Sequence, residues 1–404
     1  KDYSGLPPQN TYYDLLGREI WMEHSGFDGR TVCVEKVYDE FGNVTHESLP
    51  RIVGAAQLWT VSEYDLLNRL IRITPPDGHS VSTTYNGRVV SSQDQMGNVV
   101  TKRYGTRNDL ETVSDATGTV AYEYDAIGKL IKLTDQQGNE TTITYNIHGN
   151  KTSISDPDSG TNYFGYNGFG ELTHEFRPDG SVVTLDYDSL GRIIQRESPD
   201  GREDWLYDSR VGALGKLLRV RHIGEFEEKY YYDSLGRLSS TSTVVGSDAA
   251  RKVKYSYDSL GRLYKKYFPS GFTLLYRYNS FGYLSRIYDT NNTATPLWSV
   301  SAMDAANRVS RANLGNGLTN KYYFNSQTGA LKEVRAQSCD GGVCANEYRM
   351  KFEYDPIGNL TRRVDTVRNL DESFRYDSAY RLTSTQVRGL EKYVVQYDDL
   401  GNIT

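Results

Sequence analysis

The side chains most able to do chemistry are dispersed along this 404-residue chain. No two histidines have the spacing of a His-Glu-x-x-His motif, which builds a metal-dependent hydrolase site. Aspartates are plentiful, but most belong to Tyr-Asp or Asp-Gly pairs, where a structural role in a turn accounts for them. We therefore expect no catalytic residue, no cofactor and no metal, and we predict that the chain is not an enzyme. The histidines are His24, His46, His79, His148, His174 and His222.

One short segment has part of the pattern of a calcium-binding loop. Asp156, Asp158 and Gly160 follow the start of such a loop, but the acidic ligand at its twelfth position is missing. Aspartate also favours ordinary turns, because its carboxylate accepts hydrogen bonds from backbone N–H groups two residues further on. A plain turn is therefore the better interpretation.

The three cysteines are too few for a disulfide framework. Cys339 and Cys344 bracket the turn-rich segment Asp340-Gly341-Gly342-Val343, in which their Cα atoms can approach. A disulfide between them and a pair of free thiols both remain open, and a zinc site lacks ligands. Cys33 lies in the apolar string Thr31-Val32-Cys33-Val34 and is expected to be a buried thiol in a strand.

The spacing of the turn residues indicates a repeat. Glycine recurs every 10 or 11 residues from Gly128 to Gly201, which is typical of a chain that reverses direction at each tight turn. Tyr187-Asp188-Ser189-Leu190-Gly191-Arg192 recurs unchanged from Tyr232 and from Tyr257. Polar and apolar residues alternate between the turns, as in β-strands. Each repeat of about 21 to 25 residues is therefore predicted to be two strands and two turns, and the period favours a repeat architecture.

We take as the repeat signature the tyrosine, aspartate, glycine and, in three copies, arginine of the clearest units. These residues are Tyr124, Asp125, Gly128, Tyr187, Asp188, Gly191, Arg192, Tyr232, Asp233, Gly236, Arg237, Tyr257, Asp258, Gly261, Arg262, Tyr354, Asp355 and Gly358.

The residues before each Tyr-Asp pair predict how the strands face. Leu185 and Tyr187 flank Asp186, and Tyr255 and Tyr257 flank Ser256. Because side chains alternate along a strand, the tyrosines should share one face of a sheet and the polar residues the other. Over many strands this pattern predicts a ladder of aromatic neighbours on the tyrosine face.

The repeats run through the whole chain. We expect a single all-β array of about seventeen units over residues 1–404, with an elongated hairpin insertion at 325–353. The formal charge of −6 and the pI near 5.7 give no basic footprint for nucleic acid. No apolar run is long enough to span a membrane as a helix.

The motif Tyr-Asp-x-x-Gly-Arg-Leu at this spacing resembles the RHS repeat, or YD repeat, of bacterial toxin and animal teneurin proteins. The string from Asp156-Pro157-Asp158 to Gly170-Glu171-Leu172 is similar to the RHS region in the B and C components of insecticidal ABC toxin complexes. The resemblance extends from Tyr13-Asp14 to Tyr397-Asp398. It implies a long antiparallel β-hairpin array that winds as a spiral single-layer sheet, part of a cage or barrel shell. It also implies a secreted or surface-exposed bacterial protein.

In that family the array normally closes with a segment that carries an Asp-Pro-x-Gly type self-cleavage site, followed by a variable toxin. Asp355-Pro356-Ile357-Gly358 fits superficially, but it lies in register as one more repeat. The chain begins without Met and stops within a repeat, so we expect a fragment of a longer shell.

The resemblance implies a non-catalytic shell segment that encloses a C-terminal toxin or effector. Its partners would be that polypeptide and other shell or toxin-complex subunits. The alternative is a surface adhesion module whose exposed tyrosines and hairpins bind a glycan or a receptor.

Overall fold

The computed structural model of the chain describes residues 7–208, 212–340, 343–398 and 400–404. Over these ranges it contains 36 β-strands and no helix, so the predicted all-β class and antiparallel hairpin array are confirmed. A membrane-spanning helix is accordingly absent from the described ranges.

The strands of the first half are β1 (Gln9–Tyr13), β2 (Glu19–Ser25), β3 (Thr31–Tyr38), β4 (Val44–Ser48), β5 (Arg51–Ile52), β6 (Trp59–Tyr64), β7 (Leu70–Thr74), β8 (Val81–Asn86), β9 (Val89–Gln93), β10 (Val99–Tyr104), β11 (Leu110–Ser114), β12 (Thr119–Tyr124), β13 (Leu130–Thr134), β14 (Glu140–Tyr145), β15 (Lys151–Asp156), β16 (Gly160–Tyr166), β17 (Leu172–Phe176) and β18 (Val182–Tyr187). Those of the second half are β19 (Ile193–Ser198), β20 (Gly201–Tyr207), β21 (Leu217–His222), β22 (Phe226–Tyr232), β23 (Leu238–Val245), β24 (Arg251–Tyr257), β25 (Leu263–Tyr267), β26 (Thr273–Tyr278), β27 (Leu284–Asp289), β28 (Trp298–Met303), β29 (Val309–Leu314), β30 (Leu318–Phe324), β31 (Leu331–Asp340), β32 (Val343–Tyr354), β33 (Leu360–Asp365), β34 (Leu370–Tyr376), β35 (Leu382–Val387) and β36 (Leu390–Val394).

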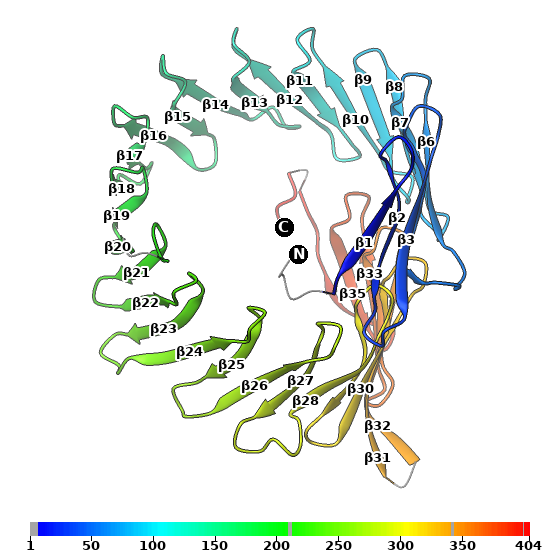
Figure 1. Ribbon diagram of the computed structural model, residues 1–404. Coiled ribbons are helices and arrows are strands. Elements are labelled where there is room, and N and C mark those ends of the chain that lie inside the picture. Colours follow the sequence, from blue (N-terminus) through cyan, green and yellow to red (C-terminus); the bar gives the residue numbers. More distant parts are fainter. Residues whose placement is uncertain (1–6, 209–211, 341–342, 399) are drawn as a thin grey trace. The chain divides into compact units, whose positions relative to one another are not determined.

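The chain divides into two compact units. Unit 1 consists of Lys1–Thr119 and Tyr276–Thr404, and unit 2 of Val120–Leu275. Within each unit, strands that follow one another in the sequence pair as antiparallel hairpins, for example β18 with β19 and β34 with β35 (Figure 1). Turns therefore alternate between two edges of the sheet. The edge that carries the Tyr-Asp turns is called the Tyr-Asp edge below, and the other is called the opposite edge.

A β-bulge accompanies the tyrosine of most repeats and was not predicted from the sequence. In unit 2, Asp186 pairs with Gln195 whereas Tyr187 pairs with Ile193, so Ile194 is an extra residue on β19. The same shift occurs at Tyr232 and Tyr257. A bulge adds local twist and re-aims the side chain beside it. The tyrosine therefore enters its turn in the same way in each of these repeats.

Little apolar surface is fully buried in this sheet. Among the described residues, the buried apolar set consists of Val32, Cys33, Val34, Val183, Ala213, Leu275, Val300 and Ala312. Most other strand residues are half-buried, as expected where both faces of a sheet keep some contact with solvent. Cys33 in β3 is a free thiol, and burial raises its pKa.

The hairpin β31–β32 is longer than the others, with strands of 10 and 12 residues. Cys339 and Cys344 pair directly across it and form a disulfide, with Cα atoms 4.1 Å apart. The predicted turn residues Gly341 and Gly342 lie outside the described residues. The disulfide joins the two strands near the end of this hairpin.

Candidate functional site

The repeat signature builds one kind of turn, seen clearly at Asp188. Its Oδ1 accepts the backbone N–H groups of Leu190 at 2.9 Å and Arg192 at 3.0 Å, and its Oδ2 accepts Nε of Arg192 at 2.7 Å. Gly191 has φ +75° and donates its N–H to the carbonyl of Asp188. The carboxylate therefore satisfies the donors of its own turn and fixes the arginine that follows.

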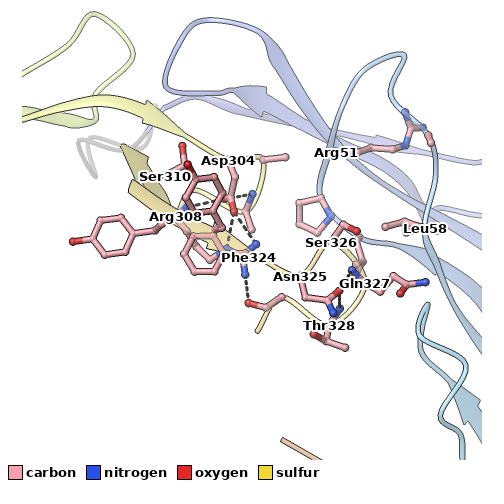
Figure 2. A pocket seen from close by; sticks show the side chains of 18 residues that line it. Arg51, Leu58, Asp304, Arg308, Ser310, Phe324, Asn325, Ser326, Gln327 and Thr328 are labelled. Atoms are coloured by element: carbon pink, nitrogen blue, oxygen red, sulfur yellow. Dashed lines mark hydrogen bonds and ion pairs between the residues drawn. The ribbon is translucent and has the colours of Figure 1, made fainter. Parts of the chain in front are cut away.

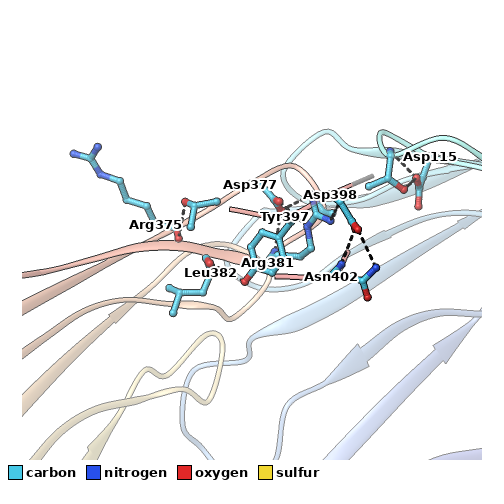
Figure 3. Close-up of polar contacts among 11 residues, drawn as sticks. Asp115, Arg375, Asp377, Arg381, Leu382, Tyr397, Asp398 and Asn402 are labelled. Carbon is cyan, nitrogen blue, oxygen red and sulfur yellow. Dashed lines mark hydrogen bonds and ion pairs between the residues drawn. The ribbon is translucent and has the colours of Figure 1, made fainter. Parts of the chain in front are cut away.

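Other turns repeat this geometry with aspartate or with asparagine. Figure 3 shows Asp377 with Arg381, 2.8 Å from Oδ2 to Nε, and Asp398 with Asn402, 2.9 Å from Oδ2 to Nδ2. Further turns in which Oδ1 accepts two backbone N–H groups begin at Asp14, Asp39, Asp65, Asp94, Asp125, Asp135, Asn146, Asn167, Asp233, Asp258, Asn279, Asp304 and Asp355.

The tyrosine of the signature clamps neighbouring strands together. Tyr187 Oη donates to the carbonyl of Leu172 at 2.8 Å, at the start of β17. Leu172 lies beyond His174, the last residue of β17 that pairs with β18. The hydroxyl thus satisfies a carbonyl that the strand ladder leaves over. Equivalent bonds are made by Tyr38, Tyr64, Tyr85, Tyr145, Tyr166, Tyr207, Tyr232, Tyr257, Tyr376 and Tyr397.

Cations lie over several of these rings, which the predicted ladder of aromatic neighbours did not include. The guanidinium of Arg192 is 4.2 Å from the ring centre of Tyr207, and that of Arg237 is 4.5 Å from the ring centre of Tyr257. Each of these arginines comes from the preceding Tyr-Asp turn, where an aspartate already orients it. Where an arginine follows the turn glycine in this way, a cation–π contact joins one repeat to the next.

The charges of the turn shift its pKa values in a consistent direction. Hydrogen bonds from the Arg192 side chain and backbone hold the pKa of Asp188 below its usual value. The Arg69 side chain has the same effect on the pKa of Asp65. Burial raises the pKa of Tyr187 and of Tyr232. These shifts belong to groups whose hydrogen-bonding positions are occupied within the fold.

The predicted signature residues do not converge on one site. Their tyrosines are the last residues of β12, β18, β22, β24 and β32, and the aspartates and glycines form the five turns that follow. The Asp355-Pro356-Ile357-Gly358 string is one of these turns, with Oδ1 of Asp355 accepting the N–H of Asn359 at 2.8 Å. Asp156 is likewise engaged in a turn, accepting the N–H groups of Asp158 and Ser159 at 3.0 Å each. In the described ranges, three or more His, Cys, Asp or Glu side chains nowhere gather closely enough to hold a metal ion.

Replacing Gly191 by valine should lower the free energy of unfolding by about 1–3 kcal/mol, because a β-branched residue is strained at positive φ. Gly191→Asn is the matched control, since Asn68 takes this position of its own turn at φ +59°. Chemical denaturation of both variants would check this. Equal loss in the two would contradict the backbone explanation.

Unit 1 contains a feature that sequence reasoning missed, a contact between the two edges of the sheet. We call it the seam. Asn279 Nδ2 donates to the carbonyl of Phe27 at 2.8 Å, and Tyr283 Oη donates to that of Ser25 at 2.9 Å. The Tyr-Asp turn 279–283 thus lies against the opposite-edge turn 26–30. Gly29 is required there, because a Cβ on it would be 2.5 Å from Cζ of Phe281.

A second part of the seam involves Tyr380, which takes the usual glycine position of its turn at φ +63°. Its hydroxyl donates to the carboxylate of Asp94 and accepts Nδ2 of Asn98 at 2.5 Å. Positive φ is strained for a bulky residue, so the contact must compensate for it. Gln327 Nε2 adds a bond to the carbonyl of Pro76 at 3.0 Å.

We expect Tyr380→Phe to destabilise unit 1 by about 1 kcal/mol, because the hydrogen bonds to the turn at Asp94 are lost while the backbone strain remains. Tyr380→Gly loses the same bonds but relieves the strain, so it should be the milder change. Thermal unfolding of the two variants, side by side, is the measurement. A more stable Tyr380→Phe protein would show that the hydroxyl contact does not hold the seam.

A cavity of about 500 Å³ opens on the seam, between the loop 49–58 and the turns 304–308 and 325–329 (Figure 2). Arg308 on its wall is bonded to Asp304 at 2.8 Å and stacked 4.0 Å over the ring of Phe324. Its lining contains no histidine or cysteine. We interpret the cavity as a gap between turns, because its lining does not assemble a reactive group.

The comparisons with known proteins point to the same repeat. The family model described as Teneurin YD-shell matches residues 13–210 and 206–403. No curated protein matches the sequence. Among solved structures, the TcdB2–TccC3 complex without its hypervariable C-terminal region aligns with a TM-score of 0.83 at 15% identity, covering 98% of this chain and 25% of that one. The Photorhabdus luminescens Tc holotoxin pore with a mutated TccC3 aligns with a TM-score of 0.81 at 16% identity and the same coverage. This chain therefore spans about a quarter of the length of those structures.

Proposed function

This chain belongs to the teneurin YD-shell family, and from that membership we propose that it is a non-catalytic shell segment that encloses and shields a C-terminal toxin or effector polypeptide of a secreted bacterial toxin system. The proposal rests on the contacts that the signature residues make. Their tyrosine, aspartate and arginine side chains lock turns and neighbouring strands together. These side chains stabilise the sheet as a wall. We infer that any catalytic activity belongs to another polypeptide.

The sparse core supports the same role. With few apolar side chains fully buried, the sheet gains its order from repeated bonds between neighbours, as repeat proteins do. A wall of this kind can be extended by adding repeats, and its stability does not depend on a central core. We infer that the partners are the enclosed polypeptide and further subunits of a shell or toxin complex, since the similar solved structures are Tc assemblies of several components.

Limited proteolysis of the full-length gene product tests the proposal. The polypeptide that the shell encloses should survive protease concentrations that degrade it when it is expressed alone. Adding the protease after mild acid treatment that unfolds the shell is the control, because it should restore digestion. Equal digestion of the flanking polypeptide in the intact and the unfolded protein would rule out enclosure.

A further inference from the structure

The Tyr-Asp edge of unit 2 presents a row of exposed apolar side chains. They are Ile127, Phe169, Leu190, Leu235 and Leu260, and we call them the apolar turn row. Phe169 keeps 94% of its surface exposed, and Leu190 and Leu235 keep 74% each. Isolated exposed apolar residues are ordinary on protein surfaces, whereas a series of them along one sheet edge favours an interaction surface.

The turn geometry fixes where these side chains project. The backbone N–H of each row residue donates to the Oδ1 of the Asp or Asn that begins its turn, at 2.9 or 3.0 Å. Each row residue therefore occupies the same place in its turn, two residues after that Asp or Asn.

The seam of unit 1 shows what can cover such a residue. Phe281 occupies the row position of its own turn, with its N–H bonded to Oδ1 of Asn279 at 3.0 Å. It is half-buried, because Gly29 of an opposite-edge turn lies directly against its ring. Phe27 of that same turn packs edge-on against Tyr283, with ring centres 6.0 Å apart.

Unit 2 also presents the other half of this contact. Its opposite-edge turns contain Gly138, Gly180 and Gly271 at φ between +82° and +87°, close to the +84° of Gly29. No atom lies within 4 Å of the position that a Cβ on any of these three glycines would take. Unit 2 thus carries both an uncovered row and uncovered glycine turns of the kind that cover such a row in unit 1.

We propose that the apolar turn row binds the opposite-edge turns of a second copy of this chain. The contact repeats, between copies, the edge-to-edge arrangement of the seam, with a row side chain packed over a glycine turn. It joins two different surfaces, so it is head-to-tail, and a copy that uses both edges can bind a neighbour at each. This association is separate from the enclosing role proposed above, and either can fail without the other.

Sedimentation velocity of the 404-residue chain tests the proposal. The mean mass should rise with concentration between about 1 and 100 μM, a range suited to an interface of modest area. The row variant Leu190→Lys/Leu235→Lys should associate at least about tenfold more weakly, because it loses two buried leucines. Ile194→Lys/Leu206→Lys is the matched control: it replaces partly exposed apolar residues of β19 and β20 with the same charges and should associate like the unmodified chain.

A mixing experiment separates head-to-tail binding from row-to-row binding. The row variant keeps its glycine turns, so a labelled sample should bind the unmodified chain more tightly than it binds itself. A row variant that joins neither would show that row meets row and would overturn the proposal. So would an unmodified chain that stays monomeric throughout the range, or a row variant that self-associates normally.

Discussion

Tyr257→Ala is expected to lower the free energy of unfolding by about 3 kcal/mol, because it removes two contacts that hold consecutive repeats together. The ring of Tyr257 lies 4.5 Å from the guanidinium of Arg237, and its hydroxyl donates to the carbonyl of Leu238 at 2.8 Å. The substitution opens a gap between the repeats and leaves that carbonyl without its partner. Chemical denaturation followed by tyrosine fluorescence measures the loss.

The companion variant Tyr257→Phe keeps the ring and its cation and removes the hydrogen bond alone, so it should cost about 1 kcal/mol. The chain itself contains this arrangement at Phe324, over which Arg308 stacks at 4.0 Å. If the alanine and phenylalanine variants were equally stable, the ring and its cation would contribute nothing, and the clamp would be a hydrogen bond only.

Acid should unfold the array over a narrow pH range. Several turn aspartates have a pKa below the ordinary value in the folded state. The side chain of Arg192 is the main cause at Asp188, and that of Asn402 at Asp398. A carboxyl with a depressed folded pKa stabilises the fold above its unfolded pKa of 3.8 and loses that contribution as the pH falls through the folded value. Because many turns share this shift, the melting temperature should be flat above about pH 5 and fall steeply below about pH 4.

Replacing Asp188, Asp233 and Asp258 together with asparagine should make the melting temperature fall less steeply as the pH is lowered. Asparagine retains the backbone acceptor, as Asn167 does with the N–H groups of Phe169 and Glu171, but it does not titrate. Melting curves of the triple variant and the unmodified chain between pH 2 and pH 7 give the comparison. An unchanged acid slope would place the titrating groups outside these turns.

The local structure was largely readable from the sequence, because the residues that make a turn are adjacent in it. Tyr187, Asp188 and Gly191 predict a strand end, an acceptor and a positive φ, and the structure has all three. The β-bulge at Tyr187 was not predicted, since it depends on which residue of β19 is skipped in the pairing.

Contacts between distant repeats could not be read in this way. Tyr380 replaces the glycine of its turn, which in isolation is only a departure from the pattern. Its partners Asp94 and Asn98 are more than 280 residues away, and nothing in the local pattern identifies them. The cations over Tyr207 and Tyr257 were missed for a related reason. The motif shows that arginine follows glycine, but it does not show where the guanidinium lies.

The contacts made by the ring and hydroxyl of the repeat tyrosine have a direction along the chain. Tyr207 finds both its acceptor, the carbonyl of Ile193, and its cation, Arg192, in residues that precede it. Tyr257 does the same with Leu238 and Arg237. A repeat that has just left the ribosome, or a narrow export channel with its N-terminus leading, therefore meets partners that are already in place. Such an array can be laid down one hairpin at a time, in the order of its synthesis, without waiting for residues still to come.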